Sequence, residues 1–318
     1  MPIHTRIAAL FLFLPVLPGL FFCARADERK PAPLELAPGT VDKDTLPTPP
    51  FDTVIVPYNV TIGRYFAFLD TLVRRYDTTA GYPLTEHLLV WANPWIIDTL
   101  ENTDYYRMMA RDSFVYEQRT LVVLRQGDIL LVPNARQAKA LLEKHRKIVL
   151  DLNIPEFKLR IFDGTDTLYT FPVRVGQHKR RYLAMSGRMT DLRTAIGAGA
   201  IASINNDPRY INPVDNKVYK VTHRDDGRVT TPPRIPWLEP EIAGRRTGHF
   251  IHPTTNPNTL GKMYSNGCVG VREADAWRIY YYAPVGTKLV FRYDLTVVTE
   301  TGDTLQLRDI YRYRNKNK

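Results

Sequence analysis

The chain is poor in cysteine and lacks the sequence patterns of nucleic-acid-binding proteins. Only Cys23 and Cys268 occur among 318 residues. There is no zinc-finger or helix-turn-helix pattern, and no cluster of Lys and Arg is interleaved with aromatic residues, so we expect no nucleic-acid partner. The composition, 44% hydrophobic and 24% charged, excludes a disordered chain and a many-pass membrane protein and is typical of a folded soluble protein.

Acidic residues are outnumbered by basic ones. The 43 Lys and Arg against 33 Asp and Glu give a net charge of +10 at pH 7, spread along the chain. Such an excess permits an anionic partner, such as cell wall or a membrane surface, without selecting one.

Residues 1–26 are predicted to be a signal peptide. A short basic start is followed by an apolar run over residues 7–22 and by Ala24-Arg25-Ala26, a small-x-small pattern after which signal peptidases cut. The mature chain then begins at Asp27, and the protein is expected to be exported to the periplasm or cell envelope.

Two other interpretations of this leader are open. A membrane anchor is one, although the run contains Pro15 and Pro18 and is shorter than the roughly 20 apolar residues of a spanning helix. Lipidation at Cys23 is the other, although Phe22 is bulky where lipoprotein signals usually have a small residue. We expect cleavage, no stable membrane span after processing, and Cys268 as the one remaining cysteine.

Two segments precede the predicted catalytic domain. Residues 27–52 are rich in proline and predict an extended tether. Residues 53–135 predict a small α+β module with helices near 66–76 and 85–92. Its Ala-Asn-Pro turn and later Gly-Asp-x-Leu-x-Val-Pro stretch resemble a lysin motif, which binds cell-wall glycan. Trp91 and Trp95 either stack on sugar rings or belong to the core.

Beyond residue 147 the pattern predicts β-structure. Apolar runs at 157–162 and 167–175 flank Asp163-Gly164, a strong hairpin signal. Only residues 274–282 predict a clear helix, so we expect a mainly β catalytic domain over residues 147–293, followed by a C-terminal β-hairpin extension at 294–318. The long polar stretch 205–246 is either a lid over a cleft or a plain surface insertion.

Cys268 is the candidate nucleophile. A solitary cysteine in an exported protein is either a small buried hydrophobe or a reactive group. A thiol attacks only as its thiolate and therefore needs a base. His252 lies at the end of a predicted strand, and the loop between the two contains Pro253, Pro257 and Gly261, which allow the chain to double back. The pattern indicates a Cys/His pair of nucleophile and base.

The residues around Cys268 suggest how a negative charge would be stabilised. Gly267 permits a sharp backbone turn, so the amides of Gly267 and Cys268 can point at one place and serve as an oxyanion hole. His249 is a tempting second base, but residues 249 and 252 of a strand point to opposite faces, and we assign His249 to packing or solvent. Asp225 and Asp226 have no nearby His or Cys ligands, so no metal and no cofactor are expected.

These residues resemble the active-site signature of the YkuD-type L,D-transpeptidases. The resemblance extends over about residues 147–293. It is carried by Ile251-His252, Gly261, Ser265-Asn266-Gly267-Cys268, Phe171–Gly176, Thr194–Gly199 and Gly286–Val290. It implies a β-sandwich that acts on peptidoglycan stem peptides, with Cys268 as nucleophile, His252 as general base and acid, and Gly267 lending backbone groups. Ser265 and Asn266 are expected to contact substrate.

The sequence departs from the family pattern at several positions. Asn266 stands where the family often has His, and Gly270 stands where many members have Arg or Asn. The nearest arginine, Arg272, either binds the substrate carboxylate or is a solvated residue at the start of a helix. Pro253 and Ala195 replace the usual Gly and Pro, which makes the acceptor the least secure inference.

The predicted function is therefore that of a peptidoglycan L,D-transpeptidase. Cys268 is expected to be acylated by a tetrapeptide stem, releasing D-Ala, and the acyl group to pass to an amine. The expected partners are peptidoglycan stem peptides and glycan. Two alternatives are open: an L,D-carboxypeptidase or endopeptidase that hydrolyses stem peptides, and a non-catalytic wall-binding protein.

Overall fold

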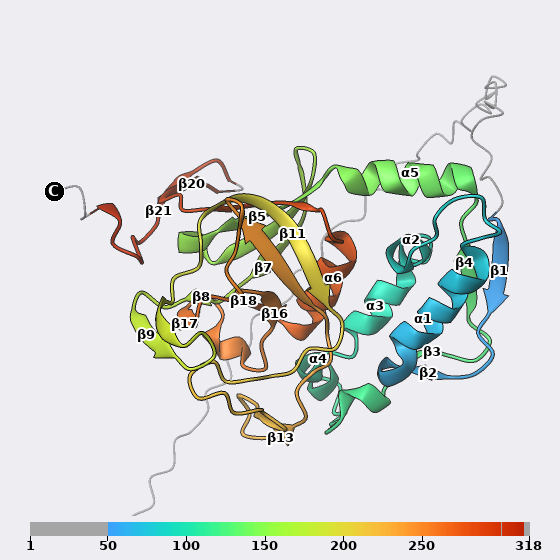
Figure 1. Cartoon of the computed structure of the whole chain (residues 1–318), viewed down its shortest axis with the longest axis horizontal. Helices are drawn as coiled ribbons and strands as arrows, with labels where there is room; N and C mark the ends of the chain where they lie inside the picture. The colour runs from blue at the N-terminus through green and yellow to red at the C-terminus, as the bar shows by residue number, and fades with distance from the viewer. Residues whose placement is uncertain (1–49, 300, 315–318) are drawn as a thin grey trace, which may run out of the picture. The chain divides into compact units, whose positions relative to one another are not determined.

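The computed structural model describes residues 50–299 and 301–314 (Figure 1). The predicted signal peptide and residues 27–49 of the predicted tether lie outside the described residues. Within the described part of the chain, no helix has both the length and the apolar character needed to cross a membrane.

The N-terminal part is a small α+β region in which short two-stranded sheets pack with helices. Apolar residues recur at helical spacing along α1, where Tyr65, Leu69 and Leu72 are buried. Thr85 caps α2 by accepting a hydrogen bond from the Leu88 N–H. Strand β1 pairs with β4, and β2 pairs with β3. The elements are β1 (Asp52–Ile55), β2 (Val60–Thr61), α1 (Ile62–Tyr76), α2 (Glu86–Trp91), α3 (Trp95–Glu101), α4 (Tyr105–Met109), η2 (Gln118–Thr120), β3 (Val122–Leu124), β4 (Ile129–Val132) and α5 (Ala135–Arg146).

The C-terminal part is built on one large mixed sheet. Its strand order is β18-β16-β14-β11-β19-β5-β6-β7, and β15 pairs with β14. The strands and 3-10 helices are β5 (Ile148–Asn153), η3 (Ile154–Glu156), β6 (Lys158–Asp163), β7 (Asp166–Pro172), β8 (Val175–Gly176), β9 (Arg180–Leu183), β10 (Arg188–Asp191), β11 (Gly197–Asn205), β12 (Thr222–His223), β13 (Val229–Thr230), β14 (Trp237–Ile242), β15 (Arg245–Arg246), β16 (Ile251–Pro253), η4 (Pro257–Thr259), β17 (Met263–Ser265), β18 (Val269–Val271) and β19 (Lys288–Arg292). The predictions of a mainly β C-terminal part and a small α+β region before it are confirmed.

Local sequence signals account for much of this sheet. The turn at Asp163-Gly164 joins β6 and β7 as predicted, and Gly164 has a φ of 62°, which glycine adopts without strain. Strand β5 pairs with β6 on one side and with β19 on the other, which places it inside the sheet. Its residues Ile148, Leu150 and Leu152 are buried, because alternate side chains of a strand point to the same face.

The prediction that residues 205–246 form a lid or a surface insertion is wrong for its last part. Residues 237–242 are strand β14, which pairs with β11 and β16 in the middle of the sheet. Its alternate residues Leu238, Pro240 and Ile242 are buried. Proline inside a run argues against a central strand, and Pro240 therefore concealed β14 in the sequence. Only residues 206–236, here termed the β11–β14 excursion, leave the sheet.

Helix α6 (Glu273–Tyr282) joins the two parts of the described structure. Trp277, Tyr280 and Tyr281 are fully buried on it. The Trp91 indole N–H donates to the Tyr281 carbonyl at 2.7 Å, and the Tyr65 and Tyr281 hydroxyls lie 2.6 Å apart. The described residues thus belong to one compact unit with a continuous core. Trp91 is a core residue and cannot stack on a sugar.

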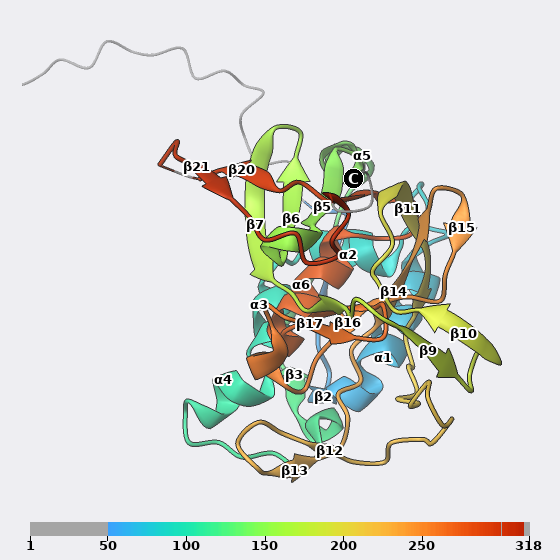
Figure 2. The same ribbon diagram turned by 90° about the vertical axis from the view of Figure 1, so that its left-hand side faces the viewer.

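A buried ion pair anchors the β11–β14 excursion to α6. The Arg224 guanidinium bonds to the Glu273 carboxylate, and the two residues are 3% and 1% exposed. Glu273 also accepts from the Gln118 side chain and the Tyr105 N–H. The hairpin of β12 and β13 is therefore held beside the α4 region, as Figure 2 shows.

The C-terminal extension contains the predicted hairpin. Strands β20 (Thr296–Val298) and β21 (Thr304–Gln306) pair antiparallel. After them the chain returns to the mainly β part, where Tyr311 is fully buried. Its hydroxyl donates to the Gly176 carbonyl at 2.9 Å, so the extension supports the body of the domain.

The Arg224–Glu273 pair predicts a large stability difference between two arginine variants. Arg224→Ala leaves the Glu273 carboxylate buried without its cation, and we expect it to lower the free energy of unfolding by about 3–5 kcal/mol. The control Arg74→Ala removes an exposed pair with Asp70 and is expected to cost less than about 1 kcal/mol. Urea unfolding measures both, and equal losses would contradict the anchoring role.

Candidate active site

Strand pairing brings the two predicted catalytic residues together. Strands β16 and β18 are parallel neighbours, with Ile251 opposite Val269 and His252 opposite Gly270. Cys268 precedes β18 by one residue, and alternation places it on the same face as Gly270. Cys268 and His252 are therefore diagonal neighbours on one face of the sheet edge. Within the described part of the chain, no direct hydrogen bond joins the Cys268 sulfur to the His252 ring.

The Cys268 thiol is half-buried and unoxidised. Burial raises its pKa above the usual thiol value. Two groups act in the opposite direction: the Phe250 N–H, which donates to the sulfur at 3.4 Å, and the nearby positive charge of Arg174. The resting residue is therefore a neutral thiol that needs a base before it attacks.

The His252 ring is held in a form suited to accept that proton. Its Nδ1 lies 2.8 Å from the Pro253 carbonyl, which only accepts, so Nδ1 carries the hydrogen and Nε2 has the free lone pair. The Trp237 ring covers the imidazole at a centroid distance of 4.9 Å. Burial, together with the Arg174 charge, lowers the His252 pKa to about 3. The ring is thus neutral at physiological pH.

Hydrogen bonds within the turn fix the loop that carries the sulfur. The Ser265 hydroxyl donates to the Cys268 carbonyl at 2.6 Å and accepts from the Gly267 N–H at 3.2 Å. Gly267 has a φ of 115°, so the predicted sharp turn is present. The Gly267 amide is already bonded inside the turn, which argues against its predicted place in an oxyanion hole. The Cys268 N–H forms no hydrogen bond with the described residues. Ser265, predicted to contact substrate, is buried and serves the turn.

Thr194 and Tyr311 hold this loop in place through hydrogen bonds. The sequence did not reveal this role for either residue. The Thr194 hydroxyl donates to the Gly267 carbonyl at 3.0 Å and accepts from the Gly176 N–H at 2.9 Å. The Tyr311 hydroxyl accepts from the Thr194 N–H at 3.1 Å. These contacts join four distant chain segments, so no local sequence signal points to them.

His249 lies against the nucleophile loop. A methyl group built on Gly267 would overlap the His249 imidazole, so the ring packs directly over this glycine. His249 precedes β16, and the argument that residues 249 and 252 alternate within one strand is therefore wrong. Its assignment to packing agrees with its position, and burial lowers its pKa.

Arg174 reaches the site from the segment between β7 and β8. Two backbone hydrogen bonds, of 2.9 and 3.0 Å, pair Arg174 with Gly270. A side chain at position 270 would meet the Arg174 Nε at 2.5 Å and its Cγ at 2.7 Å. The Arg174 side chain thus occupies the space that a side chain at position 270 would fill.

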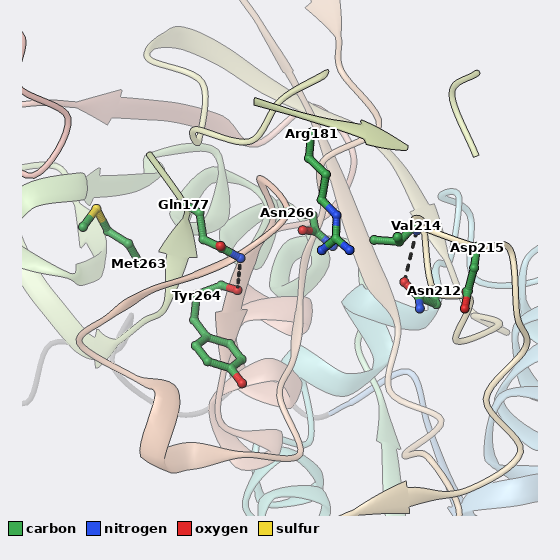
Figure 3. A pocket seen from close by; sticks show the side chains of 8 residues that line it. All are labelled: Gln177, Arg181, Asn212, Val214, Asp215, Met263, Tyr264 and Asn266. Carbon is green, nitrogen blue, oxygen red and sulfur yellow. Dashed lines mark hydrogen bonds between the residues drawn. The ribbon is translucent and has the colours of Figure 1, made fainter. Parts of the chain in front are cut away.

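A cavity of about 550 Å³ opens beside the nucleophile loop (Figure 3). Asn266, predicted to contact substrate, lines it together with Tyr264. The β11–β14 excursion contributes the opposite wall. The lining residues are Gln177, Arg181, Asn212, Val214, Asp215, Met263, Tyr264 and Asn266.

Arg272 lies elsewhere. It is exposed at the start of α6 and lines a separate cavity of about 330 Å³ that also contains Asp104, Asp225 and Asp226. Three carboxylates disfavour a bound anion, so this geometry does not support the predicted binding of a substrate carboxylate by Arg272. Within residues 50–299 and 301–314, no group of three or more His, Cys, Asp or Glu side chains is placed to hold a metal.

Part of the chain matches a known protein family. Residues 147–291 match the family model of the YkuD L,D-transpeptidase catalytic domain. No curated protein is similar enough in sequence to be matched.

Solved L,D-transpeptidases are among the structural matches. The enzyme from Mycobacterium smegmatis has 13% identity and a TM-score of 0.31, covering 46% of this chain and 58% of its own. Residues 123–326 of the Xylanimonas cellulosilytica enzyme have 14% identity and a TM-score of 0.34, covering 78% and 100%. L,D-transpeptidase 3 from Mycobacterium tuberculosis, with a faropenem-derived adduct, has 14% identity and a TM-score of 0.29, covering 46% and 60%. The chain spans about three fifths of the length of the two mycobacterial proteins.

The Gly267 turn predicts a position-specific cost of adding a methyl group. Gly267→Ala introduces an unfavourable positive φ and a clash with His249, and we expect it to lower the free energy of unfolding by about 1–3 kcal/mol and to slow alkylation of Cys268. The control is Gly261→Ala, which shares the positive φ but has no atom within 4 Å of the new methyl group. Equal effects in thermal unfolding and alkylation would contradict the role of the clash.

The two pKa shifts predict the pH profile of thiol reactivity. Because the Cys268 pKa is raised and the His252 pKa is about 3, both groups are neutral near pH 7. The rate of Cys268 alkylation by iodoacetamide should rise with pH and reach half its maximum above about 8.5, the ordinary thiol value, with no inflection near 6.5. Peptide mapping by mass spectrometry follows the rate. A plateau already reached at pH 6 would instead reveal a stable thiolate–imidazolium pair.

Proposed function

We propose that this chain, whose residues 147–291 match the L,D-transpeptidase catalytic domain, is a cysteine-dependent acyltransferase that acts on peptidoglycan stem peptides. One observation carries the proposal: the pairing of β16 with β18 places a neutral imidazole with a free Nε2 beside the only cysteine of the described chain. This is the arrangement of a nucleophile and its general base.

In the first half-reaction a tetrapeptide stem acylates the enzyme. The His252 Nε2 accepts the thiol proton as the Cys268 sulfur attacks the carbonyl carbon of the amide that joins diaminopimelate to D-Ala, and a tetrahedral intermediate with an oxyanion forms. The unpaired Cys268 N–H is the candidate donor to that oxyanion. When the C–N bond breaks, the imidazolium returns its proton to the leaving amine, and D-Ala departs.

In the second half-reaction an acceptor takes the acyl group. The side-chain amine of another stem attacks the thioester carbonyl carbon and loses a proton to the His252 Nε2. A new amide C–N bond forms, the C–S bond breaks, and the imidazolium returns its proton to the Cys268 sulfur, which regenerates the free thiol. Water in the place of the amine gives hydrolysis instead. The cavity between the nucleophile loop and the β11–β14 excursion offers room for a peptide, with Asn266 available for a polar contact.

The proposed site of action is the cell envelope. The predicted signal peptide at residues 1–26 and the matched family agree with export to the periplasm. The lysin-motif-like region, residues 53–135, is proposed to serve as a support for the catalytic domain, because its helices pack on α6.

Variants of the Cys/His pair provide the test. Cys268→Ser should abolish product formation from a defined tetrapeptide stem, and His252→Ala should slow it by about 10²–10⁴-fold because the general base is lost. Chromatography with mass detection measures free D-Ala, tripeptide and cross-linked dimer. His249→Ala is the matched control, since it removes a neighbouring imidazole that no proposed step uses.

The outcomes separate the alternatives. Dimer formation supports transfer, whereas tripeptide without dimer identifies a hydrolase. Near-normal turnover by His252→Ala would refute its role as base. A chain that processes no stem and yet sediments with cell-wall sacculi would be a wall-binding protein.

A further inference from the structure

Arg174, Gly270 and His252 lie side by side on three neighbouring segments: the segment between β7 and β8, strand β18 and strand β16. Arg174 pairs with Gly270 from one side, and His252 pairs with Gly270 from the other. Side chains of directly opposed residues lie on the same face of a sheet. Because glycine has no side chain, the Arg174 side chain can cross position 270 toward His252. It fills the space that the side chain of a larger residue would need.

The guanidinium in this row lacks an anionic partner. Arg174 is in no salt bridge with the described residues, and its Nε is buried without a hydrogen-bond acceptor. The only hydrogen bond from its side chain to the described residues is a long contact of 3.3 Å from Nη1 to the Thr259 hydroxyl. Burying a cation without a counter-charge is costly, so an unpaired guanidinium at this place is typical of a group that awaits an anion.

The charge acts on both members of the Cys/His pair. It opposes the effect of burial on the Cys268 thiol, and it adds to the effect of burial on the His252 ring. Backbone pairing fixes the arginine in this position by two hydrogen bonds, so its place does not depend on a flexible loop. Arg272, the arginine that the sequence suggested, is exposed among three carboxylates in another cavity.

We propose that Arg174 is the anion-binding residue of this active site, that it binds a carboxylate of the stem-peptide donor, and that Gly270 is glycine because the arginine crosses it. The proposal rests on the proposed function for the identity of the anion. A guanidinium binds a carboxylate through two parallel hydrogen bonds. Because backbone pairing fixes Arg174, these bonds can orient the bound carboxylate beside the attacked carbonyl. Two carboxylates of the donor stem are the candidates, the one on diaminopimelate and the one on the terminal D-Ala, because these two residues flank the attacked bond.

A pair of small alkylating reagents tests the anion site without any natural substrate. Iodoacetate carries a carboxylate, and iodoacetamide is its neutral counterpart. We divide the rate of Cys268 alkylation by iodoacetate by the rate of its alkylation by iodoacetamide. Arg174→Met is expected to lower this ratio by about tenfold, because one pair of charge-assisted hydrogen bonds to the carboxylate is lost. Arg174→Lys should retain only part of the iodoacetate preference, because the ammonium keeps the charge but cannot form the two parallel hydrogen bonds. Peptide mapping confines the measurement to Cys268 in the full chain.

A relocated charge distinguishes electrostatics from folding. The double variant Arg174→Ala, Gly270→Arg returns a guanidinium to the same space from the opposite strand, and Gly270 does not have a positive φ that would forbid a side chain. We expect it to recover the iodoacetate preference that Arg174→Met loses. Circular dichroism of each variant shows that the fold is intact.

The same measurement on Arg272 shows which result would overturn the proposal. If Arg272→Met lowers the reagent ratio and Arg174→Met does not, the carboxylate site belongs to Arg272 and the proposal is overturned. An unchanged ratio in both folded variants also overturns it.

Stem peptides then identify the carboxylate. With wild-type protein, amidation of the recognised carboxylate should lower kcat/KM, and Arg174→Met should erase the difference between acid and amide. If amidation of neither carboxylate matters, Arg174 does not bind the donor. If no stem is processed at all while the reagent ratio still depends on Arg174, the proposed function fails and the anion site stands.

Discussion

The pairing of β16 with β18 is the constraint on which the site depends. These two short strands form the end of the main sheet, and their register alone sets Cys268 and His252 on the same face. The backbone carbonyl of Pro253 then fixes the imidazole tautomer, and the Trp237 ring packs against the imidazole. Burial favours the neutral form of both groups, so in the proposed reaction the two charges would form only when a substrate is attacked.

Much of this arrangement follows from local sequence signals. The Gly267 turn, the Asp163-Gly164 hairpin and helix α6 were predictable because turn chemistry and apolar periodicity act over a few residues. The assignment of Cys268 and His252 as a pair followed from the chemical needs of a thiol nucleophile and from a family resemblance. Their catalytic roles are still a proposal, which the register of the strands supports.

Other features were not predictable because they depend on contacts between distant segments. Thr194 and Tyr311 hold the nucleophile loop through hydrogen bonds that no sequence pattern announced, although Thr194 begins a segment that resembles the family. Strand β14 was hidden by Pro240. Arg174 left one indirect signal, the glycine at position 270, because a glycine within a strand often marks the close approach of another group. The sequence showed that position as a departure from the family, and the structure shows an arginine in its space.

The central claim is that Cys268 is the residue that carries the acyl group. Incubation of the protein with a defined tetrapeptide stem, followed by acid quenching and peptide mapping, tests it most directly. The account predicts a tripeptide acyl group on the peptide that contains Cys268, with one equivalent of D-Ala released. An acyl group on another residue, or D-Ala released while Cys268 is blocked by alkylation, would contradict it.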